Sequence, residues 1–232
     1  MCGRYTLATP VERLAEAFGV GGSLPELSPN YNVAPTQEVA AVLVDGDERR
    51  LEMLRWGLIP SWAKDPEIGA RMINARSETV PEKPSFRSAF RKRRCLIPAD
   101  GFYEWQKTNN GKQPFYARMR DGSPFAFAGL WESWRDNDGP EVRTCTILTT
   151  NPNELMAQVH NRMPVILPPD YYGLWLDPDA EEDALTELFD SYPDEAMETY
   201  PVSRFVNSPS NNDERCGEPA AGEPDPKDRS PT

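Results

Sequence analysis

The sequence predicts a single α+β domain with a curved, barrel-like antiparallel β core and flanking short helices. Short runs with strand character recur along the chain, with turn residues between them. Amphipathic stretches with helical spacing are few and short. No segment repeats at a fixed period, which argues against a repeat architecture. With 232 residues, of which 38% are hydrophobic, the chain is long enough for one large domain.

The first expected element is a helix from Thr9 to Phe18. Its start fits a capping box, with Thr9 as the cap, Glu12 three residues later and Pro10 at the first helical position. Gly19 ends the run. The apolar residues of this helix share one face: Val11, Leu14, Ala15 and Phe18.

Strand signals follow in pairs. Residues 39–44 and 51–56 flank Asp45-Gly46, a turn typical of β-hairpins. Residues 115–119 and 124–130 flank a similar Asp121-Gly122 turn. We expect strands on both sides of each turn.

The second half of the chain predicts a buried strand over 142–150 and two helices. The segment Asn151-Pro152-Asn153 starts a short helix that ends near His160, and an amphipathic helix is expected over 179–189, with Leu185, Leu188 and Phe189 facing inward. From Ser208 the composition changes to Pro, Asp, Glu, Asn and Gly. We therefore expect the domain to cover 1–207 and a disordered acidic tail to cover 208–232.

The charge balance argues against a nucleic-acid partner when taken alone. The net charge is −12, and phosphate binding needs positive charge. The basic residues are six Lys and 19 Arg, however, and Arg suits bidentate phosphate contacts, so local patches matter more than the sum. An acidic, Lys-poor surface would also suit a host with a salty cytoplasm. An ordinary acidic mesophile is the alternative.

No apolar run reaches the length of a membrane span, and the start of the chain lacks the pattern of a signal peptide. We expect a soluble cytoplasmic protein and a monomer. The four cysteines contain no C-x-x-C pair and there is one histidine, so neither a metal site nor a cofactor is expected. Cys95 and Cys145 lie in apolar runs and are expected to be buried and inert, while Cys216 has no expected role.

Cys2 carries the main chemical expectation. Removal of Met1 would expose an amine and a thiol on adjacent carbons. Such a residue can act as a nucleophile with its own amine as base, or condense with an aldehyde to a Schiff base that the thiol closes into a thiazolidine. On position alone, an accidental second residue is favoured.

An ordered set of motifs changes that balance. The start Met1-Cys2-Gly3 also begins glutamine amidotransferases of the N-terminal-nucleophile class, but the rest of the chain does not look like them. In chain order the motifs are CGRY (2–5), NVAPT (32–36), RWGLIPSW (55–62), NARSET (74–79), CLIPADGFYEW (95–105) and HNRMPV (160–165). Together they resemble the SOS response-associated peptidase (SRAP) family of abasic-site processing proteins. The resemblance covers about residues 1–206.

The resemblance implies a sensor of abasic sites in single-stranded DNA. The ring-opened abasic sugar is an aldehyde, and the N-terminal cysteine of the family forms a thiazolidine cross-link with it that shields the lesion. A peptidase-like removal of the initiator methionine would account for an exposed Cys2. The protein would then be associated with the nucleoid when bound to damaged DNA.

Three further residues are expected to manage protons, each with a plainer alternative. Glu104 lies between aromatics, which would raise its pKa toward a general acid/base role; the alternative is an outward-facing strand residue. His160 would open the sugar ring or reverse the cross-link; the alternative is a helix-end histidine. Asn74 would orient the Cys2 amine or the sugar oxygen; the alternative is a turn-forming residue.

Contacts to DNA are expected from scattered residues. Arg76 is a candidate phosphate clamp, with Arg4 and Arg162 as weaker ones; for each, a surface ion pair is the alternative. Trp62 would stack on a base from a loop. Pro35, with Thr36, resembles part of the family's pocket wall near Cys2. The basic run Arg91-Lys92-Arg93-Arg94 is a further candidate for the DNA backbone.

Two other functions stay open from the sequence. One is a cysteine-dependent N-terminal-nucleophile amidase or peptidase that acts on other substrates. The other is a single-strand binder without covalent chemistry, in which Cys2→Ala would leave DNA binding unchanged.

Overall fold

The computed structural model describes residues 2–109, 111–136 and 139–220. The strands are β1 Tyr5–Leu7, β2 Asn30–Val33, β3 Glu38–Asp45, β4 Glu48–Trp56, β5 Asn74–Arg76, β6 Arg94–Ala99, β7 Gly101–Thr108, β8 Gly111–Met119, β9 Phe125–Trp134, β10 Val142–Thr150, β11 Met163–Pro164, β12 Ile166–Leu167 and β13 Met197–Pro201. The α-helices are α1 Val11–Phe18, α2 Arg87–Lys92, α3 Glu154–Ala157, α4 Tyr172–Leu176 and α5 Glu182–Thr186. The 3₁₀-helices are η1 Pro66–Arg71, η2 Ser77–Thr79, η3 Pro169–Tyr171, η4 Glu187–Phe189, η5 Asp194–Ala196, η6 Arg204–Asn207 and η7 Glu214–Gly217.

The core of the fold is a closed five-stranded barrel. Strands β10, β4, β3, β6 and β9 follow one another in the sheet, and β9 pairs with β10 to close the ring. The pairings are antiparallel except for β4 with β10, which is parallel. The expected α+β domain with a barrel-like core is confirmed, with this one parallel junction in place of a fully antiparallel ring.

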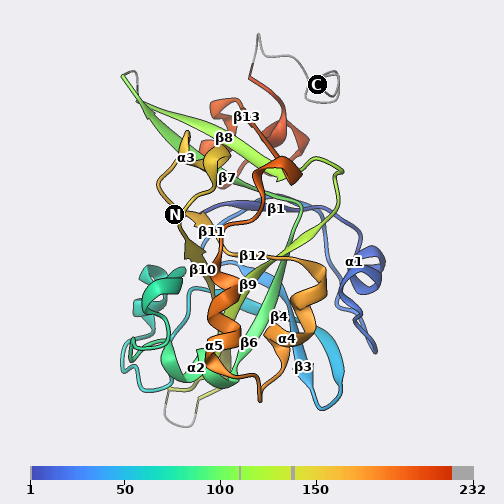
Figure 1. The fold of residues 1–232 in the computed structure, drawn as a ribbon, viewed down its shortest axis with the longest axis vertical. Helices are drawn as coiled ribbons and strands as arrows, with labels where there is room; N and C mark the ends of the chain where they lie inside the picture. The colour runs from blue at the N-terminus through green and yellow to red at the C-terminus, as the bar shows by residue number, and fades with distance from the viewer. Residues whose placement is uncertain (1, 110, 137–138, 221–232) are drawn as a thin grey trace.

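A second, antiparallel sheet of order β13-β8-β7-β1-β2 lies above the barrel in Figure 1. Strand β1 lies at the boundary between the two sheets and pairs with both β2 and β7. The turn at Asp121-Gly122 therefore joins strands of different sheets, since β8 pairs with β7 and β13 while β9 belongs to the barrel. The hairpin at Asp45-Gly46 and the strand over 142–150 are confirmed.

The helices are shorter than expected. Helix α1 begins at Val11, and the predicted capping box is wrong because the Thr9 hydroxyl donates to Asp100 Oδ1 at 2.6 Å. Gly19 ends the helix in the left-handed conformation, as predicted. Helix α3 is four residues long with Asn153 as its cap, and the helix expected over 179–189 is divided into α5 and η4.

Residues 203–220, called here the C-terminal strap, pack across the upper sheet. Val206 and Cys216 are fully buried in a small cluster with the side chains of Tyr103, Tyr116 and Tyr200. The expectation of a disordered tail from Ser208 is therefore wrong for residues 208–220, because their apolar and amide side chains find partners on β2 and β7. Residues 221–232 lie outside the described residues. Cys216, for which no role was expected, is buried in the strap and its thiol donates to the Asn211 carbonyl at 3.3 Å.

Candidate functional site

Cys2 lies in the main core beside the strand that carries Glu104. Its side chain is 0% exposed. Strand β1 pairs with β7 through Tyr5 and Phe102, and the Tyr103 amide donates to the Arg4 carbonyl at 2.9 Å. This register brings the start of the chain against the middle of β7. Met1, whose removal the sequence leads us to expect, lies outside the described residues.

The Cys2 thiol is held in its neutral form. Burial raises its pKa, and the negative charge of Glu104 raises it further. A thiol with a raised pKa is a poor nucleophile until a base removes its proton. A reaction at this thiol would therefore need a proton acceptor next to Cys2.

Asn74 contacts the Cys2 backbone. Strand β5 runs parallel to β10, with Asn74 opposite Ile147, and Asn74 Nδ2 donates to the Cys2 carbonyl at 2.8 Å. We expected Asn74 to orient the Cys2 amine or a sugar oxygen, and its amide nitrogen is used on the carbonyl instead. Asn74 Oδ1 is buried with no hydrogen-bond partner among the described residues, so the acceptor is available to a group entering the site.

Glu104 is a buried carboxyl on β7. It is 3% exposed, which excludes the alternative of an outward-facing strand residue. Burial raises its pKa, as the sequence predicted, while the charge of His160 acts in the opposite direction. A carboxyl with a raised pKa can hold a proton and release it near neutral pH.

His160 follows α3 and is half-buried. Its Nδ1 lies 3.1 Å from the Arg162 amide nitrogen, which donates to it, so the ring is oriented by its own loop. His160 and Glu104 line one pocket of about 660 Å³ between the β7–β8 hairpin and the segment after α3. Of the four predicted catalytic residues, Asn74 is hydrogen-bonded to Cys2, Glu104 is close enough for its charge to raise the Cys2 pKa, and His160 shares with Glu104 a pocket that neither Cys2 nor Asn74 lines.

The predicted DNA-contact residues differ in their surroundings. Trp62 is 59% exposed on the loop before η1, in agreement with a loop position. Arg76 is exposed at the end of β5. Pro35 is half-buried in the turn between β2 and β3 and does not line the Glu104 pocket. Their contact with DNA stays a prediction.

Two of the predicted arginines are engaged within the chain. Arg162 Nη2 donates to Glu78 Oε2 at 2.9 Å and its Nη1 also binds Glu78, an ion pair that lowers the Glu78 pKa. Arg4 Nη1 donates to Asn32 Oδ1 at 2.8 Å and to the Val206 carbonyl at 3.0 Å. Both arginines therefore have structural partners in addition to any DNA contact.

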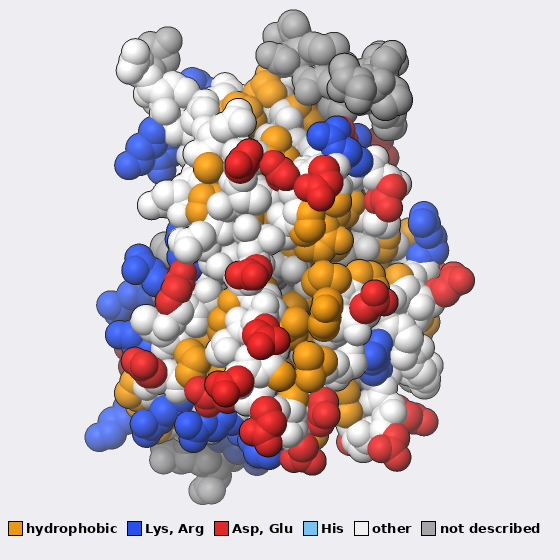
Figure 2. Space-filling view, in the orientation of Figure 1, with side chains coloured by type: hydrophobic (Ala, Val, Ile, Leu, Met, Phe, Trp, Pro, Cys, Tyr) orange, Lys and Arg blue, Asp and Glu red, His pale blue; other side chains and the backbone are white. Residues whose placement is uncertain are grey.

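The basic run at 91–94 is not an unpaired patch. Arg91, Lys92 and Arg93 pair with Glu182, Asp179 and Glu132. Arg94 is 4% exposed, and its guanidinium donates to the carbonyls of Phe90, Arg91, Trp175 and Asp177. Figure 2 shows basic and acidic side chains side by side at this lower end of the molecule. Our hypothesis that the run binds the DNA backbone is wrong for Arg94, which is buried. Arg91, Lys92 and Arg93 have acidic partners within the chain, and their contact with DNA stays a prediction.

Asn32 is a site residue to which the sequence gave us no role. It is 1% exposed, accepts from Arg4 and donates through Nδ2 to the carbonyls of Val206, Ser208 and Asn211. Trp105 Nε1 also donates to Asn207 Oδ1 at 2.8 Å. The strap thus fixes Arg4, two residues after Cys2. The NVAPT motif was the signal that could have identified Asn32.

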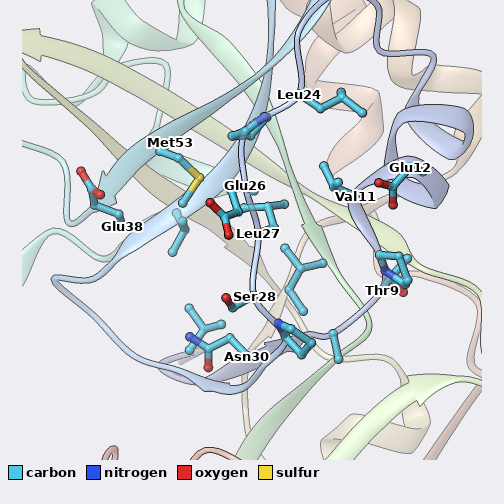
Figure 3. Close-up of a pocket in the computed structure, with 18 of the residues that line it drawn as sticks. Thr9, Val11, Glu12, Leu24, Glu26, Leu27, Ser28, Asn30, Glu38 and Met53 are labelled. Atoms are coloured by element: carbon cyan, nitrogen blue, oxygen red, sulfur yellow. The ribbon is translucent and has the colours of Figure 1, made fainter.

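A second cleft, of about 610 Å³, lies apart from these residues (Figure 3). Val11 and Leu24 lie on one side and Met53 on the other, with Glu12, Glu26 and Glu38 among its lining side chains. Three carboxylates disfavour a polyanion such as DNA there. None of the four predicted catalytic residues lines this cleft.

Within the described ranges, no group of three or more His, Cys, Asp or Glu side chains could hold a metal ion. In the same part of the chain, no helix is both long and apolar enough to cross a bilayer.

The model of the SOS response associated peptidase (SRAP) family matches residues 1–209. The abasic site processing protein YoqW of Bacillus subtilis is 49% identical over 216 residues, which cover 91% of this chain and 96% of that protein. The abasic site processing protein HMCES of Xenopus tropicalis is 33% identical, over 84% of this chain and 67% of its own length. A protein of Bacteroides thetaiotaomicron has the same fold, with a TM-score of 0.85 and 29% identity over 94% of this chain and 100% of its own.

Proposed function

The chain belongs to the SOS response associated peptidase (SRAP) family, and on that premise we propose that it cross-links to abasic sites in single-stranded DNA through Cys2 after Met1 is removed. Its relatives named as abasic site processing proteins support a role in DNA damage. The observation that carries the proposal is the set of residues around Cys2. Asn74 is hydrogen-bonded to the Cys2 carbonyl, the charge of the buried Glu104 raises the pKa of the Cys2 thiol, and His160 lines the same pocket as Glu104.

The proposed reaction joins the Cys2 amine and thiol to one aldehyde carbon. The amine adds to the carbonyl, a protonated Glu104 supplies the proton with which the oxygen leaves as water, and a protonated imine and the Glu104 carboxylate remain. The thiol then gives its proton to that carboxylate while its sulfur adds to the imine carbon, which closes the five-membered ring and leaves the nitrogen with its own proton. One water molecule is released overall.

The surroundings suit these proton transfers. The raised pKa of Glu104 favours the protonated acid needed in the first step. The carboxylate formed there can accept the thiol proton in the second step, which restores the protonated acid. His160 shares the pocket and is proposed to move the proton that opens the sugar ring. Asn74 Oδ1 is proposed to accept from the Cys2 amine once Met1 has left.

Removal of Met1 is part of the same proposal. Hydrolysis of the Met1–Cys2 bond adds one water molecule and frees the amine that the cross-link needs. Glu104 is proposed to activate that water. Trp62 and Arg76, both exposed, are proposed to contact the flanking DNA by stacking and by phosphate binding.

The test uses single-stranded DNA with one abasic site and a denaturing gel, with intact mass measured to confirm that Met1 is absent. We expect a shifted band whose formation Cys2→Ala abolishes and Cys95→Ala, a matched buried cysteine, leaves intact. DNA whose abasic aldehyde has been reduced should give no band. Absence of a Cys2-dependent adduct would overturn the proposal, and Cys2-dependent hydrolysis of amides without an adduct would support the amidase in its place.

A further inference from the structure

Two lysines face each other across the β7–β8 hairpin. Lys107 on β7 lies directly opposite Lys112 on β8, and both are exposed. Like charges at directly opposed positions destabilise a strand pair. The chain has only six lysines and a net charge of −12, so a pair of opposed lysines is not explained by a general excess of basic residues.

Neither lysine is neutralised within the described part of the chain. Lys92 pairs with Asp179 at 3.3 Å, whereas no ion pair joins Lys107 or Lys112 to a described carboxylate. The adjacent cross-strand pair is the neutral Gln106 and Gln113. Among the described residues, no carboxylate therefore offsets the repulsion between the two ammonium groups.

The two lysines line the same pocket as Glu104 and His160. Among the described residues that line it, Glu104 is the single acidic one, and its raised pKa favours the neutral form. Gln106 Nε2 donates to the Gln158 carbonyl at 2.7 Å, which ties the hairpin to the segment that carries His160. Figure 2 shows basic side chains over the outer part of this hairpin, at the upper left.

We propose that Lys107 and Lys112 form a phosphate subsite, which holds the DNA backbone next to the abasic sugar while the sugar reacts at Cys2. The proposal rests on the proposed function and adds to it the residues that recognise the flanking strand. A phosphate between two ammonium groups removes their repulsion. A lysine ammonium can also bind a phosphate in many orientations, which suits a lesion that occurs in any sequence.

The salt dependence of DNA binding tests the proposal directly. The probe is an undamaged single-stranded oligonucleotide, and Cys2→Ala serves as the common background so that binding stays reversible. Each neutralised phosphate of a single strand contributes about 0.7 to the slope of log Kd against log salt, so loss of this one phosphate subsite in K107Q/K112Q should lower the slope by about 0.7. The affinity advantage of the parent over this variant should then shrink about 2.6-fold between 50 mM and 200 mM KCl.

Lys83→Gln is the matched control, since Lys83 is an exposed lysine that does not line this pocket, and its slope should equal that of the parent. K107R/K112R should restore the slope by retaining the charge. The urea midpoint of K107Q/K112Q should equal or exceed that of the parent, because the substitution removes a repulsion. A slope within error of the parent, in a variant that folds, overturns the subsite.

Cross-linking separates this proposal from the proposed function. With Cys2 intact and DNA in excess, K107Q/K112Q should reach the adduct yield of the unsubstituted protein but need more DNA for half the yield. An unchanged salt slope with a normal adduct would overturn the subsite alone. A changed slope with no adduct in the unsubstituted protein would support the subsite and overturn the proposed function.

Discussion

Replacing Asn32 by Ala should loosen the C-terminal strap and destabilise the whole domain. The side chain is 1% exposed, accepts a hydrogen bond from Arg4, and shares its two N–H groups among the carbonyls of Val206, Ser208 and Asn211. These amount to three hydrogen bonds, each of which contributes about 1 kcal/mol. The Val206 carbonyl keeps Arg4 as a donor, and residues 208 and 211 lie near solvent, so we expect a loss of about 3 kcal/mol.

Urea unfolding measures the loss, and hydrogen exchange locates it. Protection should fall in residues 203–220 before it falls in the barrel strands. Asn32→Asp is the informative companion because it retains the oxygen that accepts from Arg4 but presents a second oxygen to the three carbonyls. We expect it to release the strap as Asn32→Ala does.

A change below about 1 kcal/mol in Asn32→Ala, or unchanged exchange in the strap, would refute the reasoning. In the first case the hydrogen bonds of the Asn32 side chain would be replaceable by water. In the second the aromatic cluster around Cys216 would hold the strap without Asn32.

Three further substitutions test single features. Glu104→Gln should stabilise the protein at about pH 8 and have little effect near pH 4. Because burial raises the pKa of Glu104 in the folded protein, the stabilising protonated form is present below the ordinary pKa near 4.5 and is lost as the pH rises through the pKa of the folded state. The variant should also cross-link slowly, which a gel time course measures. Gly57→Ala should cost about 3 kcal/mol or more in urea unfolding, since Gly57 has φ +127° and an added Cβ would lie 2.6 Å from the Gly69 carbonyl oxygen. Arg94→Met should cost about 3 kcal/mol or more in the same assay, because it orphans carbonyls that the guanidinium now satisfies.

Each of these has a contradicting result. Equal stability of Glu104→Gln and the parent at every pH would mean that the carboxyl is not destabilised by burial. A mild Gly57→Ala would mean that the two backbone segments separate easily. A stable Arg94→Met that loses DNA binding would restore the DNA-backbone role that we have corrected.

Local patterns in the sequence predicted local structure well. The Asp45-Gly46 turn fixes its own hairpin because the signal and the paired strands are adjacent in the chain. The partners of β8 could not be read in this way, since strand pairing between distant segments leaves no local trace. The same limit explains the capping box, where Asp100, 91 residues away, takes the Thr9 hydroxyl.

The candidate site, like the fold, could be predicted from the sequence only in part. Cys2, Asn74, Glu104 and His160 were identified by motif resemblance, and burial then supplied the physical reason for the raised pKa of Glu104. The ion pairs of the basic run at 91–94 could not be predicted, because the acidic partners lie between 39 and 91 residues further along the chain. The strap was missed because its polar composition is typical of disorder, while its stability comes from a few buried amides and one buried thiol.

The strap also has a consequence for the order in which the protein is made. The amino end with Cys2 emerges from the ribosome first, but Arg4 and Asn32 gain their strap partners only after the chain has been synthesised past residue 211. Until then the amino end can pair with β7 through its backbone, but it lacks the strap contacts of the Arg4 and Asn32 side chains. The surroundings of the amino end are therefore completed late, when translation has delivered the strap.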